Sequence, residues 1–361
     1  MGAGPLAGVR VLEFAGIGPG PFCGMLLADM GADVVRVDRA SGADATAGAI
    51  CGRGKRSVAL DLKTERGRQS ALDLAAAADL LIEGYRPGVM ERLGLGPDAA
   101  LGRNPRLVYG RMTGWGQQGA LAQRAGHDIN YIGLSGALAA IGPREAPLQP
   151  LNLVGDYGGG ALYLALGLLA ALWESRTSGA GQVVDCAMVD GAASLMTSFY
   201  QLFGRGLWTT GRGENYLDGG LPYYRPYVCA DGKWVTVGAL EPEFYANLLA
   251  GLGLDPQSCP QHDRGGHAAL GKALAETFIT RTRDEWCAHF EGVDACVGPV
   301  LDLSEAPTHP VNADRSGFAM VDGGWEPAPA PRFSRTPSEI RGGAPVAGAH
   351  TAEILHEWRA A

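Results

Sequence analysis

The feature that most constrains the fold is a regular alternation of short apolar strands with helical segments over the first half of the chain. Apolar runs bounded by turn residues predict strands, and the residues between them follow the period of a helix. The predicted strands are 9–14, 34–37, 57–62, 79–83 and 106–109, and the helical segments between them are 22–30, 66–78 and 90–101. Because parallel strands joined by helices are buried on both faces, this alternation predicts an α/β fold with a helix-covered parallel sheet.

The pattern changes in the second half. A long apolar helix is predicted from Tyr157 to about Ser175, followed by a strand at 182–186 and a helical run at 188–203. Beyond them, an Asp-Gly step at 231–232 joins two apolar runs and predicts a hairpin. Its strands are 223–229 and 233–237, with helices at 242–252, 267–280 and 283–291. We therefore predict a large domain (1–204), a glycine-rich linker (205–220), a smaller α+β domain (221–315) and an extended, proline-rich return segment (316–361) that packs on the large domain or on a partner subunit.

Composition excludes several classes of protein. The 361 residues carry a net charge of -8, which argues against nucleic acid as the main partner. The longest uncharged stretch, 157–173, is shorter than the roughly 20 residues of a membrane helix, so we expect a buried helix and no membrane span. The start of the chain lacks the basic region of a signal peptide, and the seven cysteines form no CxxC motif. These features favour a cytoplasmic protein with reduced thiols, and the seven histidines show no metal-ligand spacing.

A glycine-rich turn follows the first strand. Gly16, Gly18 and Gly20 precede a predicted helix, and Asp38 lies about 20 residues further on, as in a dinucleotide-binding fingerprint. However, Pro21 stands where close packing of helix on sheet asks for the third glycine. The pattern therefore favours a tight turn that starts a helix over an NAD or FAD site.

Basic residues gather in the first third of the chain. Between 36 and 68 there are eight basic against four acidic side chains. Arg39, the run RGKRSVALDLK (53–63) and the run EGYRPGVMERLGLG (83–96) offer cations and turn amides at successive strand ends. Phosphate groups are bound by such donors, so we predict phosphate binding at this edge of the sheet. The alternative is a solvated charged surface.

Two polar residues mark the starts of predicted helices. His127 lies in AGHDINYIGLSG (125–136), and Asp156 lies in NLVGDYGGGALYL (152–164). Asp156 occupies the position expected of a helix N-cap, where a carboxylate accepts backbone hydrogen bonds. Taken singly, each residue is explained by a structural role.

Motifs spread over most of the chain resemble one family, the class III CoA-transferases. They occur in the order GIGPGP, ADVVRVDR, RGKRSVALDLK, IEGYRPGVMERLGLG, MTGWGQQG, AGHDINYI, NLVGDYGGG, GQVVDCAMVDG and GALEPEFY, between residue 5 and about 335. The resemblance implies a Rossmann-like large domain, a smaller domain, an interlocked homodimer and an acyl-CoA thioester as substrate. Coenzyme A would be part of that substrate, with no separate cofactor.

The GHDINY segment resembles the racemase branch of the family, which implies an isomerase. Its reaction would interconvert (2R)- and (2S)-2-methylacyl-CoA thioesters by 1,1-proton transfer through an enolate, with His127 and Asp156 as the two bases. Glu241, in ALEPEFY, would orient the His127 ring. The alternative is a transferase that moves CoA between carboxylic acids through a covalent intermediate on Asp156.

The resemblance also implies the residues that contact CoA. Those at the strand ends would bind the nucleotide and pantetheine parts, and a segment beside His127 would lie near the thioester. The first group is Arg39, Leu60, Asp61, Leu62, Lys63, Gly84, Tyr85, Arg86 and Arg92, and the second is Gly126, Asp128, Ile129, Asn130 and Tyr131.

Overall fold

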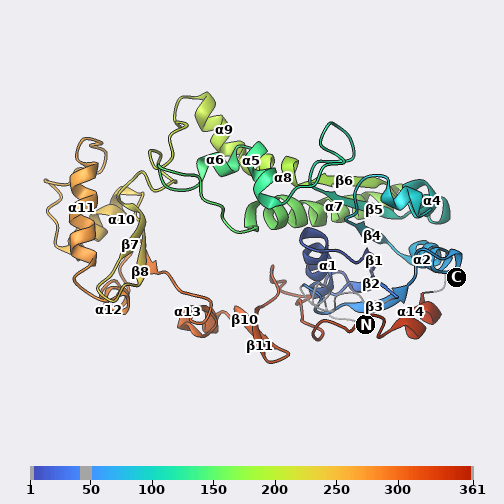
Figure 1. Cartoon of the computed structure of the whole chain (residues 1–361). Coiled ribbons are helices and arrows are strands. Elements are labelled where there is room, and N and C mark those ends of the chain that lie inside the picture. Colours follow the sequence, from blue (N-terminus) through green and yellow to red (C-terminus); the bar gives the residue numbers. More distant parts are fainter. Residues whose placement is uncertain (1–3, 41–50, 359–361) are drawn as a thin grey trace. The chain divides into compact units, whose positions relative to one another are not determined.

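The structure is a computed structural model that describes residues 4–40 and 51–358. Contacts divide the chain into two compact units (Figure 1). The first unit comprises Met1–Ala137, Pro150–Thr197 and Asp314–Ala361, and the second comprises Leu138–Gln149 and Ser198–Ala313. The short segment 138–149 thus groups with the second unit, although its sequence neighbours on both sides belong to the first.

A six-stranded parallel sheet forms the centre of the first unit, as the strand–helix alternation predicts. Its strands are β1 (Arg10–Phe14), β2 (Asp33–Arg39), β3 (Arg56–Leu60), β4 (Leu80–Glu83), β5 (Val108–Thr113) and β6 (Val183–Ala187). Their spatial order is β3-β2-β1-β4-β5-β6, and every neighbouring pair is parallel. This is the strand order of a Rossmann-type fold, in which the direction of winding reverses between β1 and β4.

Strand β5 lies further along the chain than predicted. The predicted strand, 106–109, overlaps the observed one, Val108–Thr113, by only two residues. In the structure Arg111 forms ion pairs with Glu83 of β4 and with Glu91, so its charge is compensated by two carboxylates.

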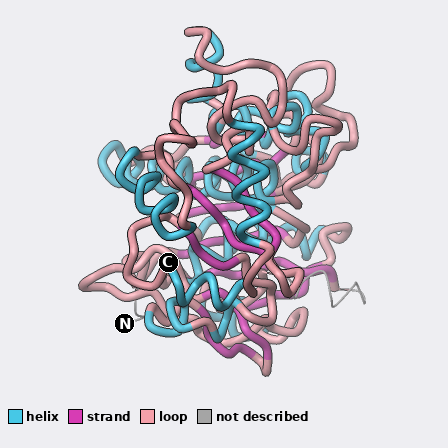
Figure 2. Tube along the Cα trace, turned by 90° about the vertical axis from the view of Figure 1, so that its left-hand side faces the viewer, coloured by secondary structure: helices cyan, strands magenta, loops and turns pink. Residues whose placement is uncertain are grey.

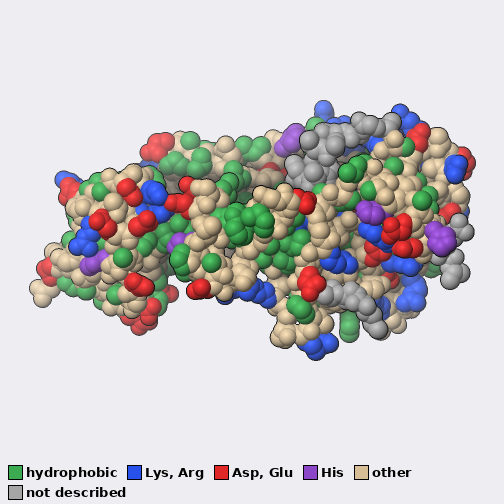
Figure 3. Space-filling view, turned by 90° about the horizontal axis from the view of Figure 1, so that it is seen from below, with side chains coloured by type: hydrophobic (Ala, Val, Ile, Leu, Met, Phe, Trp, Pro, Cys, Tyr) green, Lys and Arg blue, Asp and Glu red, His purple; other side chains and the backbone are tan. Residues whose placement is uncertain are grey.

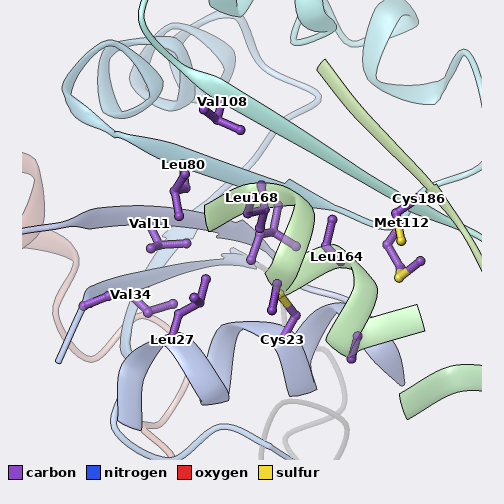
Figure 4. Close-up of a cluster of buried hydrophobic side chains, with 14 of the residues drawn as sticks. Val11, Cys23, Leu27, Val34, Leu80, Val108, Met112, Leu164, Leu168 and Cys186 are labelled. Atoms are coloured by element: carbon purple, nitrogen blue, oxygen red, sulfur yellow. The ribbon is translucent and has the colours of Figure 1, made fainter. Parts of the chain in front are cut away.

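Helices cover both faces of this sheet (Figure 2). Along the chain they are α1 (Pro19–Asp29), α2 (Glu65–Ala77), α3 (Val89–Arg92), α4 (Pro97–Arg103), α5 (Asp128–Leu134), α7 (Tyr163–Ser178) and α8 (Met188–Leu195). Two further helices, α6 (Ala137–Ala140) and α9 (Thr197–Gly204), belong to the second unit except for their first residues. Alternate residues of each strand point to opposite faces. Val11 therefore packs in a core with α1 and α7 (Figure 4), while Leu12 packs on the other face with α2.

A π-helix, η1 (Leu153–Leu162), leads directly into α7. Its wider turn is visible in the bond from the Tyr157 amide to the Asn152 carbonyl, five residues earlier. The sequence predicts a helix only from Tyr157. By length and composition the stretch 153–178 is apolar enough to cross a membrane, but Leu164 and Leu168 are buried in the core against the sheet (Figure 4). Leu162, Leu166 and Trp173 of the same stretch are exposed, and a single apolar helix of this kind is weak evidence for a membrane span.

The second unit contains a three-stranded antiparallel sheet in the order β7-β8-β9. The strands are β7 (Tyr224–Val228), β8 (Trp234–Gly238) and β9 (Val297–Pro299), and the helices are α10 (Pro242–Leu252), α11 (His267–Phe278), α12 (Arg283–His289), η2 (Ala306–Thr308) and α13 (Pro310–Asp314). Gly232 adopts a φ of 75° in the turn between β7 and β8, a conformation that glycine adopts freely. The hairpin and the smaller α+β architecture agree with the sequence prediction.

The return segment is not purely extended, contrary to the prediction. It forms a hairpin of β10 (Phe318–Val321) and β11 (Gly324–Pro327), and later a helix, α14 (Thr351–Glu357). The prolines of this segment lie before α14. Ile354 of α14 and Trp358, the residue after it, are buried in the core on the α2 face of the sheet. Arg56 of β3 pairs with Glu353 and Glu357, which attaches α14 to the edge strand of the sheet (Figure 1).

Candidate active site at the carboxyl end of the parallel sheet

A cavity of about 630 Å³ opens at the carboxyl ends of β1, β4 and β5. The loops 16–21, 84–87 and 113–115 line it, together with His127 and Asp156. Ligands of open parallel sheets bind at this kind of position, where the winding direction reverses and two neighbouring loops diverge. The fold therefore brings the two candidate acid–base residues into one binding cavity.

The glycine-rich turn after β1 forms one wall of the cavity. Gly18 has a φ of 73° and caps α1, which begins at Pro19. A Cβ atom on Gly18 would lie 3.4 Å from Oδ2 of Asp156, so the turn approaches that carboxylate closely. Asp38 lies elsewhere: it is buried and accepts hydrogen bonds from Arg36 Nε and Ser57 Oγ. The tight-turn interpretation of the glycine motif is therefore the one that fits the structure.

His127 is the residue before α5, as the sequence predicts. Its backbone amide donates a hydrogen bond to Oδ1 of Asn130 at 3.0 Å, and its side chain is exposed to the cavity. The preceding residue, Gly126, lies against the edge-to-face pair of Trp115 and Tyr131. A Cβ at position 126 would come within 2.8 Å of both rings, so glycine is required there by space.

Asp156 lies within the first turn of η1, and the prediction that it caps the helix is wrong. Asn152 is the capping residue, and its Nδ2 donates to Oδ2 of Asp156 at 3.2 Å. The helix begins at Leu153, four residues before the predicted start at Tyr157, and its first turns are π-helical, which α-helical spacing does not anticipate. Gly159 and Gly160, which follow, pack against α8 and Pro19, where added Cβ atoms would collide.

The surroundings of the Asp156 carboxyl group shift its pKa. Its partial burial raises its pKa above the ordinary value, and the negative charge of Asp128 adds to that rise, while the Asn152 hydrogen bond and His127 oppose it. A carboxyl group is a better acid–base catalyst at neutral pH when its pKa is raised, because both protonation states are then accessible.

The predicted CoA contacts fall into two groups in the structure. Gly84, Tyr85, Arg86, Gly126 and Tyr131 line the cavity. The second group lies along the carboxyl edge of the sheet or on neighbouring helices. Arg39 and Leu60 pair in register at the ends of β2 and β3, and Asp61, Leu62 and Lys63 follow β3. Arg92 is the last residue of α3, and Ile129 and Asn130 are exposed on α5. Their contact with CoA stays a prediction.

Two of the predicted site residues are placed differently from the others. Asp128 is buried, and its carboxylate faces the backbone of η1. Glu241 belongs to the second unit, where it is exposed and precedes α10. Its role in orienting His127 stays a prediction.

A buried ion-pair network under the loop after β4 was missed from the sequence. Glu83 accepts hydrogen bonds from the Tyr85 amide at 2.8 Å and from Arg111 Nε at 2.9 Å, and Arg111 also pairs with Glu91. Glu83 is only 1% exposed, and burial raises its pKa. The network fixes the loop that carries Tyr85 and Arg86. The sequence signal for this ion-pair network is a charged residue inside each of two apolar strands, Glu83 in LLIE and Arg111 in VYGRMT.

The basic run splits into two parts. Four of its cations are held in ion pairs inside the fold: Arg36 with Asp38, Arg53 with Asp29, Lys55 with Glu13 and Arg56 with Asp33. Arg39 and Lys63 remain exposed at the carboxyl edge of the sheet. On the face drawn in Figure 3, basic and acidic side chains are interspersed. Within residues 4–40 and 51–358, no group of three or more His, Cys, Asp or Glu side chains is placed to hold a metal ion.

Comparison with known proteins identifies the family. The model of CoA-transferase family III matches residues 6–351, so the chain belongs to this family. It is 48% identical to alpha-methylacyl-CoA racemase of Mus musculus and 45% identical to that of Homo sapiens, in both cases over 98% of this chain and 93% of the relative. A solved CAIB/BAIF family protein from Brucella suis has a TM-score of 0.87 and 25% identity, and the match covers 99% of this chain and 100% of that one.

Proposed function

We propose that this chain is an isomerase that interconverts the (2R) and (2S) forms of 2-methylacyl-CoA thioesters. The observation that carries the proposal is the presence of His127 and Asp156 in one cavity of a chain that is nearly half identical to two alpha-methylacyl-CoA racemases. The predicted function class and the family resemblance agree with these comparisons.

The chemistry requires two groups that flank the α-carbon of the thioester. One base takes the α-proton, and the electron pair of the broken C–H bond delocalises into the thioester to give an enolate. The other group, in its acid form, returns a proton to the opposite face of the carbon. An imidazole and a carboxyl group with a raised pKa can both alternate between base and acid, so His127 serves one face and Asp156 the other.

Substrate binding would use the carboxyl edge of the sheet. Arg39, Lys63, Arg86 and Arg92 are exposed cations that suit the phosphates of CoA. The loop 84–87, fixed by Glu83, would guide the pantetheine arm towards the cavity. CoA is then carried in as part of the substrate, and no separate cofactor is needed for the proton transfer. We further propose a cytoplasmic homodimer in which Glu241 orients the His127 ring.

CoA transfer is the alternative within the same family. A transferase would use the Asp156 carboxylate as a nucleophile, and the reaction would need a second carboxylic acid as acceptor. The identity to the two racemases favours proton transfer over this alternative.

The test is incubation of one epimer of a 2-methylacyl-CoA in deuterium oxide without any acceptor acid, followed by mass and chirality analysis. The proposal predicts epimerisation with deuterium at the α-carbon, and loss of epimerisation in His127→Ala. If the thioester binds but neither exchanges nor epimerises, the racemase proposal is wrong for that substrate. Hydroxylamine-sensitive labelling of Asp156, together with product formation only after an acceptor acid is added, would support CoA transfer.

A further inference from the structure

Asp128 links the two elements that carry the proposed acid–base pair. It is the first residue of α5, directly after His127, and it is 6% exposed. Its Oδ2 accepts hydrogen bonds from the backbone amides of Gly155 and Asp156, both at 2.7 Å. These two bonds connect the start of α5 to the first turn of η1. The other carboxyl oxygen, Oδ1, is buried and has no hydrogen-bond partner among the described residues.

Gly155 makes this connection sterically possible. A Cβ atom at position 155 would lie 2.5 Å from Oδ2 of Asp128, closer than real Cβ contacts. Gly155 does not adopt a positive φ, so its backbone conformation is open to other residues. The absence of a side chain is therefore required by the Asp128 carboxylate and not by the helix itself.

We propose that Asp128 is a positioning residue for the proton transfer, one that holds the Asp156 backbone in register with His127. This inference rests on the proposed racemase function. Hydrogen bonds from amides to a carboxylate are about twice as strong as neutral ones, so one buried group can hold the turn in place. Catalysis depends on such placement, because a displacement of about 1 Å can cost roughly 100-fold in rate.

The charge of Asp128 has a second effect, on Asp156 itself. The groups that face the Asp156 carboxyl are Asn152 on η1, His127 and Asp128 at the start of α5, and the neighbouring Tyr131 and Tyr157. Burial, with the charges of Asp156 and Asp128, raises the pKa of Tyr131 to about 12, so that phenol is neutral near pH 7. The negative charge of Asp128 raises the pKa of Asp156 and so favours its acid form.

The experiment compares three variants with one matched control. Asp128→Ala removes both amide bonds, Gly155→Ala displaces the same carboxylate from the opposite side, and Asp128→Asn keeps an acceptor oxygen but removes the charge. The control is Asp79→Asn, because Asp79 also accepts a backbone amide bond, from Arg10 at 2.8 Å, but at the start of β1, away from the cavity. For each protein, α-proton exchange in deuterium oxide is measured separately from each epimer, with kcat, KM and the pH profile.

The expected loss is selective. Asp128→Ala and Gly155→Ala should lower kcat by about 100-fold for the epimer whose exchange is abolished in Asp156→Asn, with KM changed less than about threefold. Exchange of the other epimer, which His127 deprotonates, should persist. In Asp128→Asn the loss should be smaller, and the limb of the pH profile that belongs to Asp156 should move to lower pH. Asp79→Asn should behave as the unsubstituted protein.

Two other outcomes are distinguishable. If the unsubstituted protein epimerises the substrate but Asp128→Ala retains its kcat, or slows both epimers equally, Asp128 is not a positioning residue for Asp156. If the unsubstituted protein shows no exchange at all although it binds the thioester, the proposed function fails, and this inference fails with it.

Discussion

A buried ion pair beneath the glycine-rich turn gives a quantitative test of the fold around the site. Lys55 and Glu13 have fully buried side chains, and Lys55 Nζ donates to both Glu13 oxygens, at 2.9 and 2.7 Å, and to the Pro21 carbonyl at 2.9 Å. Substitution Lys55→Met leaves the Glu13 carboxylate without its counter-charge. Removal of one partner of such a pair costs about 3–5 kcal/mol, so we expect a loss of this size in the free energy of unfolding near pH 8.

The pH dependence of the loss follows from Glu13. Burial raises the pKa of Glu13 above its ordinary value of 4.5, while Lys55 lowers it, so the pKa rises further in Lys55→Met. A carboxyl group with a raised pKa contributes stability below its unfolded pKa, and this contribution is lost as the pH rises through the folded pKa. The loss caused by Lys55→Met should therefore be smaller near pH 5 than near pH 8.

The assay is chemical denaturation followed by circular dichroism, with two reference variants. In Glu13→Leu/Lys55→Met both charges of this pair are removed, so neither is left without its partner. Stability should therefore return to within about 2 kcal/mol of the unsubstituted protein, the residual cost being the unpaired Pro21 carbonyl. Lys272→Met removes an exposed lysine that lies 3.6 Å from Glu276, and the midpoint should not change. A loss below about 1 kcal/mol in Lys55→Met, or no recovery in the double variant, would refute the reasoning.

Three further predictions concern the cavity. Glu83→Gln should raise KM for acyl-CoA about tenfold with little change in kcat, because it weakens the anchor of the Tyr85 amide; a fall in kcat alone in steady-state assays would contradict this role. Gly18→Ala forces a side chain into a φ of 73°, at a cost of about 1–2 kcal/mol, and places a methyl group 3.4 Å from Asp156. We expect kcat to fall while the affinity for CoA, measured by calorimetry, is retained. An unchanged kcat would contradict the placement of this turn. Asn152→Ala removes a hydrogen bond that lowers the pKa of Asp156. The acid limb of the pH–rate profile, measured for the epimer that Asp156 deprotonates, should therefore move to higher pH. A shift to lower pH would contradict this effect of the hydrogen bond on the pKa.

The sequence predicts the sheet well because its strands are buried on both faces. Strands such as 9–14 and 79–83 are short apolar runs between turns, and local pattern alone locates them to within a residue or two of β1 and β4. The helix α14 was not predicted, because its stability comes from tertiary contacts: Ile354 and Trp358 enter the core, and Arg56 supplies the ion pairs. Seven residues of ordinary composition give no comparable signal in the sequence.

The candidate site shows the same division between local and tertiary signals. His127 was correctly placed at the start of a helix, because the pattern after it is regular. The π-helical turn around Asp156 is not predicted, because its i−5 hydrogen bond and the close packing of Gly159 and Gly160 against neighbouring elements leave no periodic signal in the sequence. Asp128 was assigned to CoA contact from the resemblance, whereas its bonds to an element 27 residues away are visible only in the structure.

Exchange of the α-proton, measured from each epimer separately in His127→Ala and in Asp156→Asn, tests the central claim most directly. If the two residues serve opposite faces of one carbon, neither variant epimerises, and each still incorporates deuterium with retention into one epimer, a different one for each variant. If both variants lose exchange from the same epimer, or if Asp156→Asn still epimerises at the original rate, His127 and Asp156 are not the two bases of this site.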